Sequence, residues 1–133
     1  MDKAECRTEV TAALQRLGML VSRKDPSVLA EFANDADVLL VGSEGSEVVE
    51  GPAALRRFFS EVFRAPANIG WEWRRVHISS ADDVAWLFAE GELVIVADAH
   101  PQRRPYRLTG VLQRQGRRWL WKHFHGSEPA QTI

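Results

Sequence analysis

The part of the chain that follows residue 70 contains four segments in which apolar and polar residues alternate. The segments are WEWRRVHIS, VAWLFAEGELVIVA, YRLTGVLQR and RWLWKHFHG, and a loop, DAHPQRRP, separates the second from the third. Alternation with a period of two is typical of β-strands, and short connections favour antiparallel neighbours. The sequence therefore predicts an antiparallel meander of four strands. Gly91, inside the second segment, indicates a bulge or bend of the kind that a strongly curved sheet needs.

Helical patterns come before this meander. Residues 3 to 22 carry apolar side chains at spacings of three and four, and Asp25 followed by Pro26 is typical of the start of a short second helix. ADVLLVG and the residues after the glycine-rich turn predict a β-hairpin, and Pro52 opens a third helix, PAALRRFFSEVF. This order predicts an α+β fold in which three N-terminal helices pack on a strongly curved antiparallel β-sheet.

Size and composition narrow the class of protein. The 133 residues, 45% of them hydrophobic, fit a single domain over residues 1–133. A net charge of -1 gives no reason to expect a nucleic-acid partner. No segment is apolar and long enough for a signal peptide or a membrane span, so we expect a cytoplasmic protein without membrane contact. No phosphate loop or dinucleotide fingerprint occurs, and no cofactor is expected.

Four stretches of the chain resemble a known family. LAEFANDADVLLVG, EGPAALRRFF, DDVAWLFAEGEL and YRLTGVLQRQGRRWLWKHFHGSEP are similar to the SnoaL-like branch of the nuclear transport factor 2-like (NTF2-like) superfamily, whose fold is an α+β cone. The superfamily contains ketosteroid isomerase, epoxide hydrolases, polyketide cyclases and non-catalytic transport or assembly domains, so the resemblance leaves the reaction open. Aligned from Phe32, the isomerase's proton-shuttling aspartate corresponds to Leu40. The isomerase mechanism is therefore not carried over.

The tail WLWKHFHG holds the main candidates for a pocket. In a regular strand one face carries Trp119, Trp121, His123 and His125, and the other carries Leu120, Lys122 and Phe124. Because burying Lys122 would be costly, we expect the tryptophans and histidines to face inward. His123 would then be either a core imidazole or a pocket group that acts as general base or orients a ligand. No third ligand stands at a metal-site spacing, so no metal is expected.

Neighbouring strands supply further candidates. Arg107 should face the same side and pair with a carboxylate of the protein or of a ligand. Trp71, Trp73 and Trp86 could line an aromatic pocket, but they also suit a core or a dimer interface. The full set of predicted pocket residues is His123, His125, Arg107, Tyr106, Trp121, Trp86 and Trp73.

Two functions remain open on this basis. The first is a domain that binds a small apolar molecule inside the cone, as a binding protein or as a general acid–base isomerase, cyclase or hydrolase. The second is a non-catalytic dimeric binding or assembly module. An inward carboxylate near His123 would favour the enzyme, and Glu90 and Asp37 are candidates. Outward apolar side chains such as Leu120 and Phe124 predict a homodimer through the outer sheet face.

Overall fold

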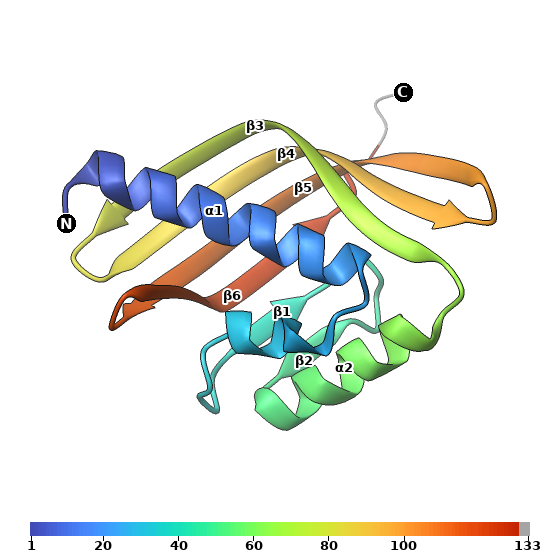
Figure 1. The fold of residues 1–133 in the computed structure, drawn as a ribbon, viewed down its shortest axis with the longest axis horizontal. Coiled ribbons are helices and arrows are strands. Elements are labelled where there is room, and N and C mark those ends of the chain that lie inside the picture. Colours follow the sequence, from blue (N-terminus) through green and yellow to red (C-terminus); the bar gives the residue numbers. More distant parts are fainter. Residues whose placement is uncertain (131–133) are drawn as a thin grey trace.

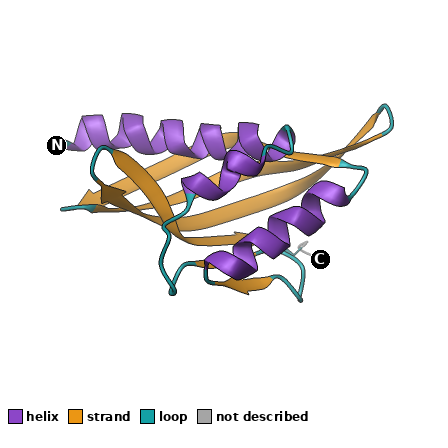
Figure 2. Ribbon diagram, turned by 60° about the horizontal axis from the view of Figure 1, so that its bottom comes forward, coloured by secondary structure: helices purple, strands orange, loops and turns teal. Residues whose placement is uncertain are grey.

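The computed structural model describes residues 1–130 as one curved sheet with helices on one of its faces (Figure 1; Figure 2). The elements in chain order are α1 (Lys3–Ser22), the 3₁₀ helix η1 (Pro26–Glu31), β1 (Leu39–Val41), β2 (Val48–Glu50), α2 (Pro52–Arg64), β3 (Asn68–Ala81), β4 (Val84–Ala97), β5 (His100–Gln115) and β6 (Arg118–Ser127). The six strands lie in the order β2-β1-β6-β5-β4-β3. Figure 1 shows α1 crossing the long strands, with η1 and α2 near β1 and β2.

The helices begin at the predicted residues. Asp2 caps α1 by accepting a 2.8 Å hydrogen bond from the Glu5 backbone N–H, and the apolar stripe of α1 is buried against the sheet. Asp25 caps η1 by accepting from the Ser27 N–H at 2.9 Å. This second element is a six-residue 3₁₀ helix. The expected three N-terminal helices are thus two α-helices and a 3₁₀ helix, and α2 follows the first two strands.

The predicted meander is confirmed for β3, β4, β5 and β6, which pair antiparallel in sequence order. The sheet is nevertheless mixed, because β1 pairs parallel with β6. The predicted loop DAHPQRRP is wrong, since β5 already begins at His100. Pairing between β5 and β6 ends at Arg107, so Pro101 and Pro105 lie where β5 has no described neighbour on that side. Proline is tolerated at such an edge because no ladder hydrogen bond is lost.

Two bulges interrupt the regular alternation of the meander. In β3, Trp73 pairs with Gly91 and Arg75 pairs with Glu90, which leaves Arg74 as an extra residue. The predicted irregularity near Gly91 therefore exists, but the additional residue belongs to the opposite strand. In β6, Trp121 pairs with Leu112 and His123 pairs with Val111, which leaves Lys122 as an extra residue. Each bulge reverses the faces on which the following side chains lie.

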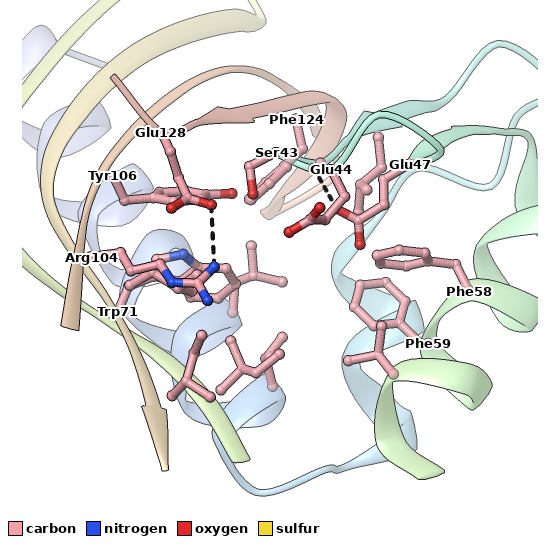
Figure 3. A pocket seen from close by; sticks show the side chains of 18 of the residues that line it. Ser43, Glu44, Glu47, Phe58, Phe59, Trp71, Arg104, Tyr106, Phe124 and Glu128 are labelled. Carbon is pink, nitrogen blue, oxygen red and sulfur yellow. Dashed lines mark hydrogen bonds and ion pairs between the residues drawn. The ribbon is translucent and has the colours of Figure 1, made fainter. Parts of the chain in front are cut away.

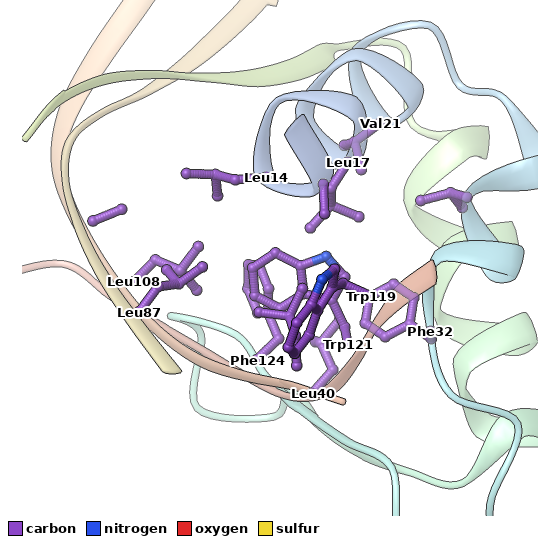
Figure 4. Packing of buried hydrophobic residues seen from close by; sticks show 14 of the residues in the cluster. Leu14, Leu17, Val21, Phe32, Leu40, Leu87, Leu108, Trp119, Trp121 and Phe124 are labelled. Carbon is purple, nitrogen blue, oxygen red and sulfur yellow. The ribbon is translucent and has the colours of Figure 1, made fainter. Parts of the chain in front are cut away.

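The core lies between α1 and the concave face of the sheet (Figure 4). Trp121 is fully buried there, and its ring packs against Phe124 with centroids 5.6 Å apart. Trp119 is also buried, and its Nε1 donates to Glu9 Oε2 at 3.0 Å. These contacts hold the first residues of β6 under α1. No helix within residues 1–130 has the length and apolar character needed to cross a membrane.

A buried carboxylate connects three elements close to the Trp119–Glu9 contact. Glu31, at the end of η1, is only 3% exposed. Its Oε1 accepts from Arg16 Nε of α1 at 2.8 Å, and its Oε2 accepts from a guanidinium nitrogen of Arg118 of β6 at 3.0 Å. Both oxygens are therefore satisfied by charge-assisted hydrogen bonds, which is what a buried charge requires.

Candidate ligand-binding pocket

A cavity of about 170 Å³ lies between α1, α2, the β1–β2 connection and the long strands (Figure 3). Most of its wall is apolar. Six aromatic side chains contribute to the wall, namely Phe32, Phe58, Phe59, Trp71, Tyr106 and Phe124. The polar lining residues are Ser43, Glu44, Glu47, Arg104 and Glu128. A mostly apolar wall with a few polar groups is typical of small-molecule sites.

Three rings from three different strands form one side of the cavity. The centroid of Trp71 in β3 lies 6.1 Å from that of Tyr106 in β5 and 6.1 Å from that of Phe124 in β6. Leu40 in β1 pairs with Phe124 and also lines the cavity. The position aligned with the isomerase's aspartate is thus inside the cavity, but it carries an aliphatic side chain.

Tyr106 is the most buried polar group of the cavity wall, with 4% of its surface exposed. Burial raises the pKa of its phenol above the ordinary value, and the negative charges of Glu47 and Glu128 add to this rise, while the Trp71 indole opposes it. The phenol is therefore neutral at physiological pH and can donate a hydrogen bond. No side-chain hydrogen bond within residues 1–130 involves its hydroxyl.

A second donor lies in the same wall. The indole Nε1 of Trp71 is buried, and it has no hydrogen-bond partner in the described part of the chain. An indole N–H can only donate, so this atom needs an acceptor. Trp71 and Tyr106 therefore present two neighbouring donor groups to a mostly apolar cavity, and the buried Trp71 Nε1 has no acceptor within hydrogen-bond distance among residues 1–130.

The β1–β2 connection places a carboxylate at the edge of the cavity. Glu47 Oε1 accepts from the backbone N–H of Glu44 at 3.0 Å, and the Gly42 N–H donates to the Glu47 carbonyl at 2.8 Å. A Cβ on Gly42 would collide with the Glu47 side chain, so glycine is required for this close approach. Across the cavity, a guanidinium nitrogen of Arg104 lies 3.7 Å from Glu128 Oε2 (Figure 3).

Only part of the predicted pocket set lies near the cavity. Tyr106 lines it. Trp73 stacks on Trp71 at 6.2 Å and also approaches Tyr106, but it stands behind the cavity wall. Trp121 belongs to the buried core beside Phe124. These two tryptophans support the wall from behind.

The inward orientation predicted for the histidines is wrong. Because Lys122 is an extra residue, Phe124 pairs with Leu40 on the cavity side, and His123 and His125 lie on the opposite face. Their rings are neighbours there, with centroids 6.3 Å apart. Lys122 itself binds Asp35 and Asp37 at 2.9 and 2.8 Å.

Two further candidates share that outer face. Arg107 is half exposed, and its Nε donates to Glu90 Oε2 at 3.1 Å, so its partner is a carboxylate of the protein. Trp86 is 46% exposed and pairs with Val111 of β5. Glu90 and Asp37, the candidates for an inward carboxylate, are bound to Arg107 and Lys122.

Sequence reasoning missed Phe124 and Glu47 as lining residues, and it considered Trp71 as a wall residue without including it in the pocket set. Phe124 was assigned outward because Lys122 was counted as a regular strand residue. Glu47 belongs to the turn GSEGSE, and its position directly after the strand that carries Leu40 was the available signal. No group of three or more His, Cys, Asp or Glu side chains among residues 1–130 is arranged to hold a metal ion.

The fold and the sheet topology define an α+β protein with a curved six-stranded sheet, and the comparisons identify its family. The family model of the SnoaL-like domain matches residues 10–131, so the chain belongs to the SnoaL-like domain family. No curated protein matches the chain.

Solved structures show the same fold at low sequence identity. An NTF2-like superfamily protein from Salmonella enterica superposes with a TM-score of 0.85 at 15% identity, covering 99% of this chain and 96% of that one. A proposed aromatic ring hydroxylase from Novosphingobium aromaticivorans gives 0.84 at 18% identity, covering 98% and 94%. A proposed dehydratase from Streptomyces avermitilis gives 0.83 at 18% identity, covering 93% and 96%. At these identities the similarity concerns the fold alone.

Proposed function

We propose that this protein binds a small, mostly apolar molecule that carries a hydrogen-bond acceptor. The observation that supports this best is the buried Trp71 Nε1, which has no acceptor in the described residues and lies beside the Tyr106 phenol, in a mostly apolar cavity of about 170 Å³. A buried donor without an acceptor costs about 1–3 kcal/mol. A ligand carbonyl, ether or hydroxyl oxygen between the two groups would remove this cost on binding.

The size of the cavity suits a compact ring. An apolar protein cavity of about 150 Å³ is large enough to take benzene. The aromatic wall formed by Trp71, Phe124 and Phe59 would stack against such a ring or contact its edge. A substituted benzene or a similarly sized alicyclic molecule with one oxygen acceptor is the ligand class that we expect.

Proton-transfer catalysis is a second candidate function, and the position of Glu47 favours it. A carboxylate at the edge of an apolar cavity can act as a general base while the neutral Tyr106 phenol donates to the developing negative charge on an oxygen. In this proposal Glu47 is the general base, a role that the aliphatic Leu40 cannot fill. A Glu47→Gln variant should then bind ligand but lose turnover.

The binding proposal is tested with two probes of similar shape. Acetophenone carries a carbonyl acceptor, and ethylbenzene carries none. Measured by calorimetry or ligand-observed NMR, acetophenone should bind about tenfold more tightly, which corresponds to about one net hydrogen bond. The Tyr106→Phe and Trp71→Phe variants should each reduce this preference, and the Trp86→Phe control on the outer face should keep it. Equal affinity of both probes for the natural protein would contradict the proposal.

We also propose that the outer sheet face forms a homodimer. Phe124 does not contribute, because it lines the cavity, but Trp86, Phe88 and Val111 form an apolar group on that face. Trp86 is 46% exposed although it is a tryptophan, a residue enriched at interfaces. Sedimentation should show a dimer for the natural protein and a monomer for Trp86→Glu. A monomer in both cases would rule this interface out.

A further inference from the structure

The formal charges of the residues that line the cavity do not sum to zero. Three carboxylates, Glu44, Glu47 and Glu128, and one guanidinium, Arg104, line it, which gives a formal charge of -2. Figure 3 shows Glu44 and Glu47 on one side of the cavity and the Arg104–Glu128 pair on the other. The electrostatic potential is therefore negative on the side of the cavity that Glu44 and Glu47 line, which is called the acidic edge below.

The two carboxylates on the β1–β2 side have no basic partner. Arg104 is already paired with Glu128, and no ion pair within residues 1–130 involves Glu44 or Glu47. Asp35 and Asp37, in contrast, are both paired with Lys122. Glu44 and Glu47 thus give the β1–β2 side of the cavity a negative charge.

A second, independent observation shows that this edge belongs to a ligand site. Tyr106, 4% exposed, carries a hydroxyl without a side-chain partner in the described residues, and it lines the same cavity as Glu44 and Glu47. Its phenol also responds to the charge at the edge, because Glu47 and Glu128 contribute to the raised pKa of Tyr106. A ligand in this cavity would therefore contact both the acidic edge and the donor groups.

We propose that the ligand is a cation, in which a compact apolar ring carries both the oxygen acceptor for Trp71 and Tyr106 and an amine. This inference deepens the proposed binding function and rests on it. The ring fills the aromatic cavity, and the ammonium group lies at the edge beside Glu47 and Glu44. Ring faces of Phe58, Phe59 and Trp71 in the same wall would add cation–π attraction.

The same charges disfavour an anionic ligand. A carboxylate or phosphate on the ligand would meet the formal charge of -2 of the lining residues, and the one guanidinium, Arg104, would have to leave Glu128 to bind it. Like charges at short distance are repelled most where water is partly excluded. The site should therefore rank ligands of one skeleton as cation, neutral molecule, anion.

The test uses three probes with one skeleton, each with a ring hydroxyl as oxygen acceptor: tyramine, tyrosol and 3-(4-hydroxyphenyl)propanoate. At low salt and neutral pH, calorimetry should give the amine about tenfold higher affinity than the alcohol, because one partly screened ion pair contributes that order of stabilisation. The anion should bind more weakly than the alcohol. Raising the salt concentration should bring the amine and the alcohol closer together.

Two variants separate the acidic edge from charge elsewhere on the same hairpin. In Glu44→Gln/Glu47→Gln the ratio of amine to alcohol affinity should fall towards one. The Glu50→Gln control removes an exposed carboxylate of β2 that does not line the cavity, and it should keep the ratio of the natural protein.

The outcomes distinguish this inference from the function on which it rests. If the alcohol binds and the amine binds no more tightly, the cationic ligand is wrong and the binding function stands. If none of the three probes binds, both are wrong. If Glu50→Gln lowers the ratio as much as the double variant does, the preference comes from general surface charge, and the proposed site for the amine is overturned.

Discussion

The Tyr106 hydroxyl lies directly against the Cα of Gly126, across the β5–β6 ladder. A Cβ on residue 126 would occupy the position of the phenol oxygen, so the ring can enter the cavity wall only above a glycine. Arg107 and Ser127, which follow these two residues along their strands, form the last pair of the ladder. The glycine at the end of β6 therefore decides where the cavity's most buried polar group stands.

Gly126→Ala should displace the Tyr106 ring and lower the free energy of unfolding by about 1–3 kcal/mol, as is usual when a side chain is forced into a packed site. Affinity for a cavity ligand should fall with it. Urea unfolding measures the first effect and calorimetry the second. Gly45→Ala is the control, because a Cβ there meets no atom within 4 Å. Equal stability of the two variants would show that Tyr106 is free to move.

The pH dependence of Tyr106 can be measured directly, because it is the only tyrosine in the chain. The folded-state pKa is raised by burial, so the folded phenol keeps its proton where the unfolded phenol, with a pKa of about 10, loses it. The unfolded state then binds fewer protons, and stability falls as the pH rises above about 10. Tyrosinate absorbance should appear only as the protein unfolds. Absorbance that rises earlier, in folded protein, would contradict the assignment.

Deletion of Lys122 should be tolerated better than deletion of His125. Removing Lys122 eliminates the bulge and leaves Trp121 and Phe124 facing inward, at the cost of the bonds to Asp35 and Asp37. Removing His125 turns Gly126 outward and puts Ser127 beneath Tyr106.

Near-ultraviolet circular dichroism and urea unfolding compare the two deletions. The Lys122 deletion should keep a cooperative transition, with a loss of about 1–3 kcal/mol for the polar contacts. The His125 deletion should lose the tertiary signal. Similar damage from both deletions would mean that the bulge itself is needed for the curvature of β6.

Replacing both histidines of the tail should leave the cavity unchanged. In His123→Ala/His125→Ala, affinity for acetophenone should stay within about twofold of the natural protein, because these side chains lie on the outer face. Phe124→Ala, which opens the cavity wall, should weaken binding by about tenfold or more. Loss of binding in the histidine variant would place an imidazole in the cavity after all.

Local sequence patterns determined the elements of this protein. The apolar stripe of residues 3 to 22, the capping Asp25 and the initial Pro52 identify three helical segments, and the alternation in VAWLFAEGELVIVA predicts β4 to the residue. These signals depend on interactions within a few residues of each other. For that reason these helices and strands can be predicted from one sequence without knowledge of the tertiary structure.

The tertiary structure decided which side chains face the cavity. Both WEWRRVH and WLWKHFH read as regular strands, but an extra residue, Arg74 in one and Lys122 in the other, reverses the faces after the second tryptophan. A bulge forms where pairing with a neighbouring strand and closure of a curved sheet demand it, and no local pattern in these segments marks it. The sequence alone therefore determined that the tail belongs to a sheet, and only its pairing with β5 and β1 put Phe124 in the cavity and the histidines outside.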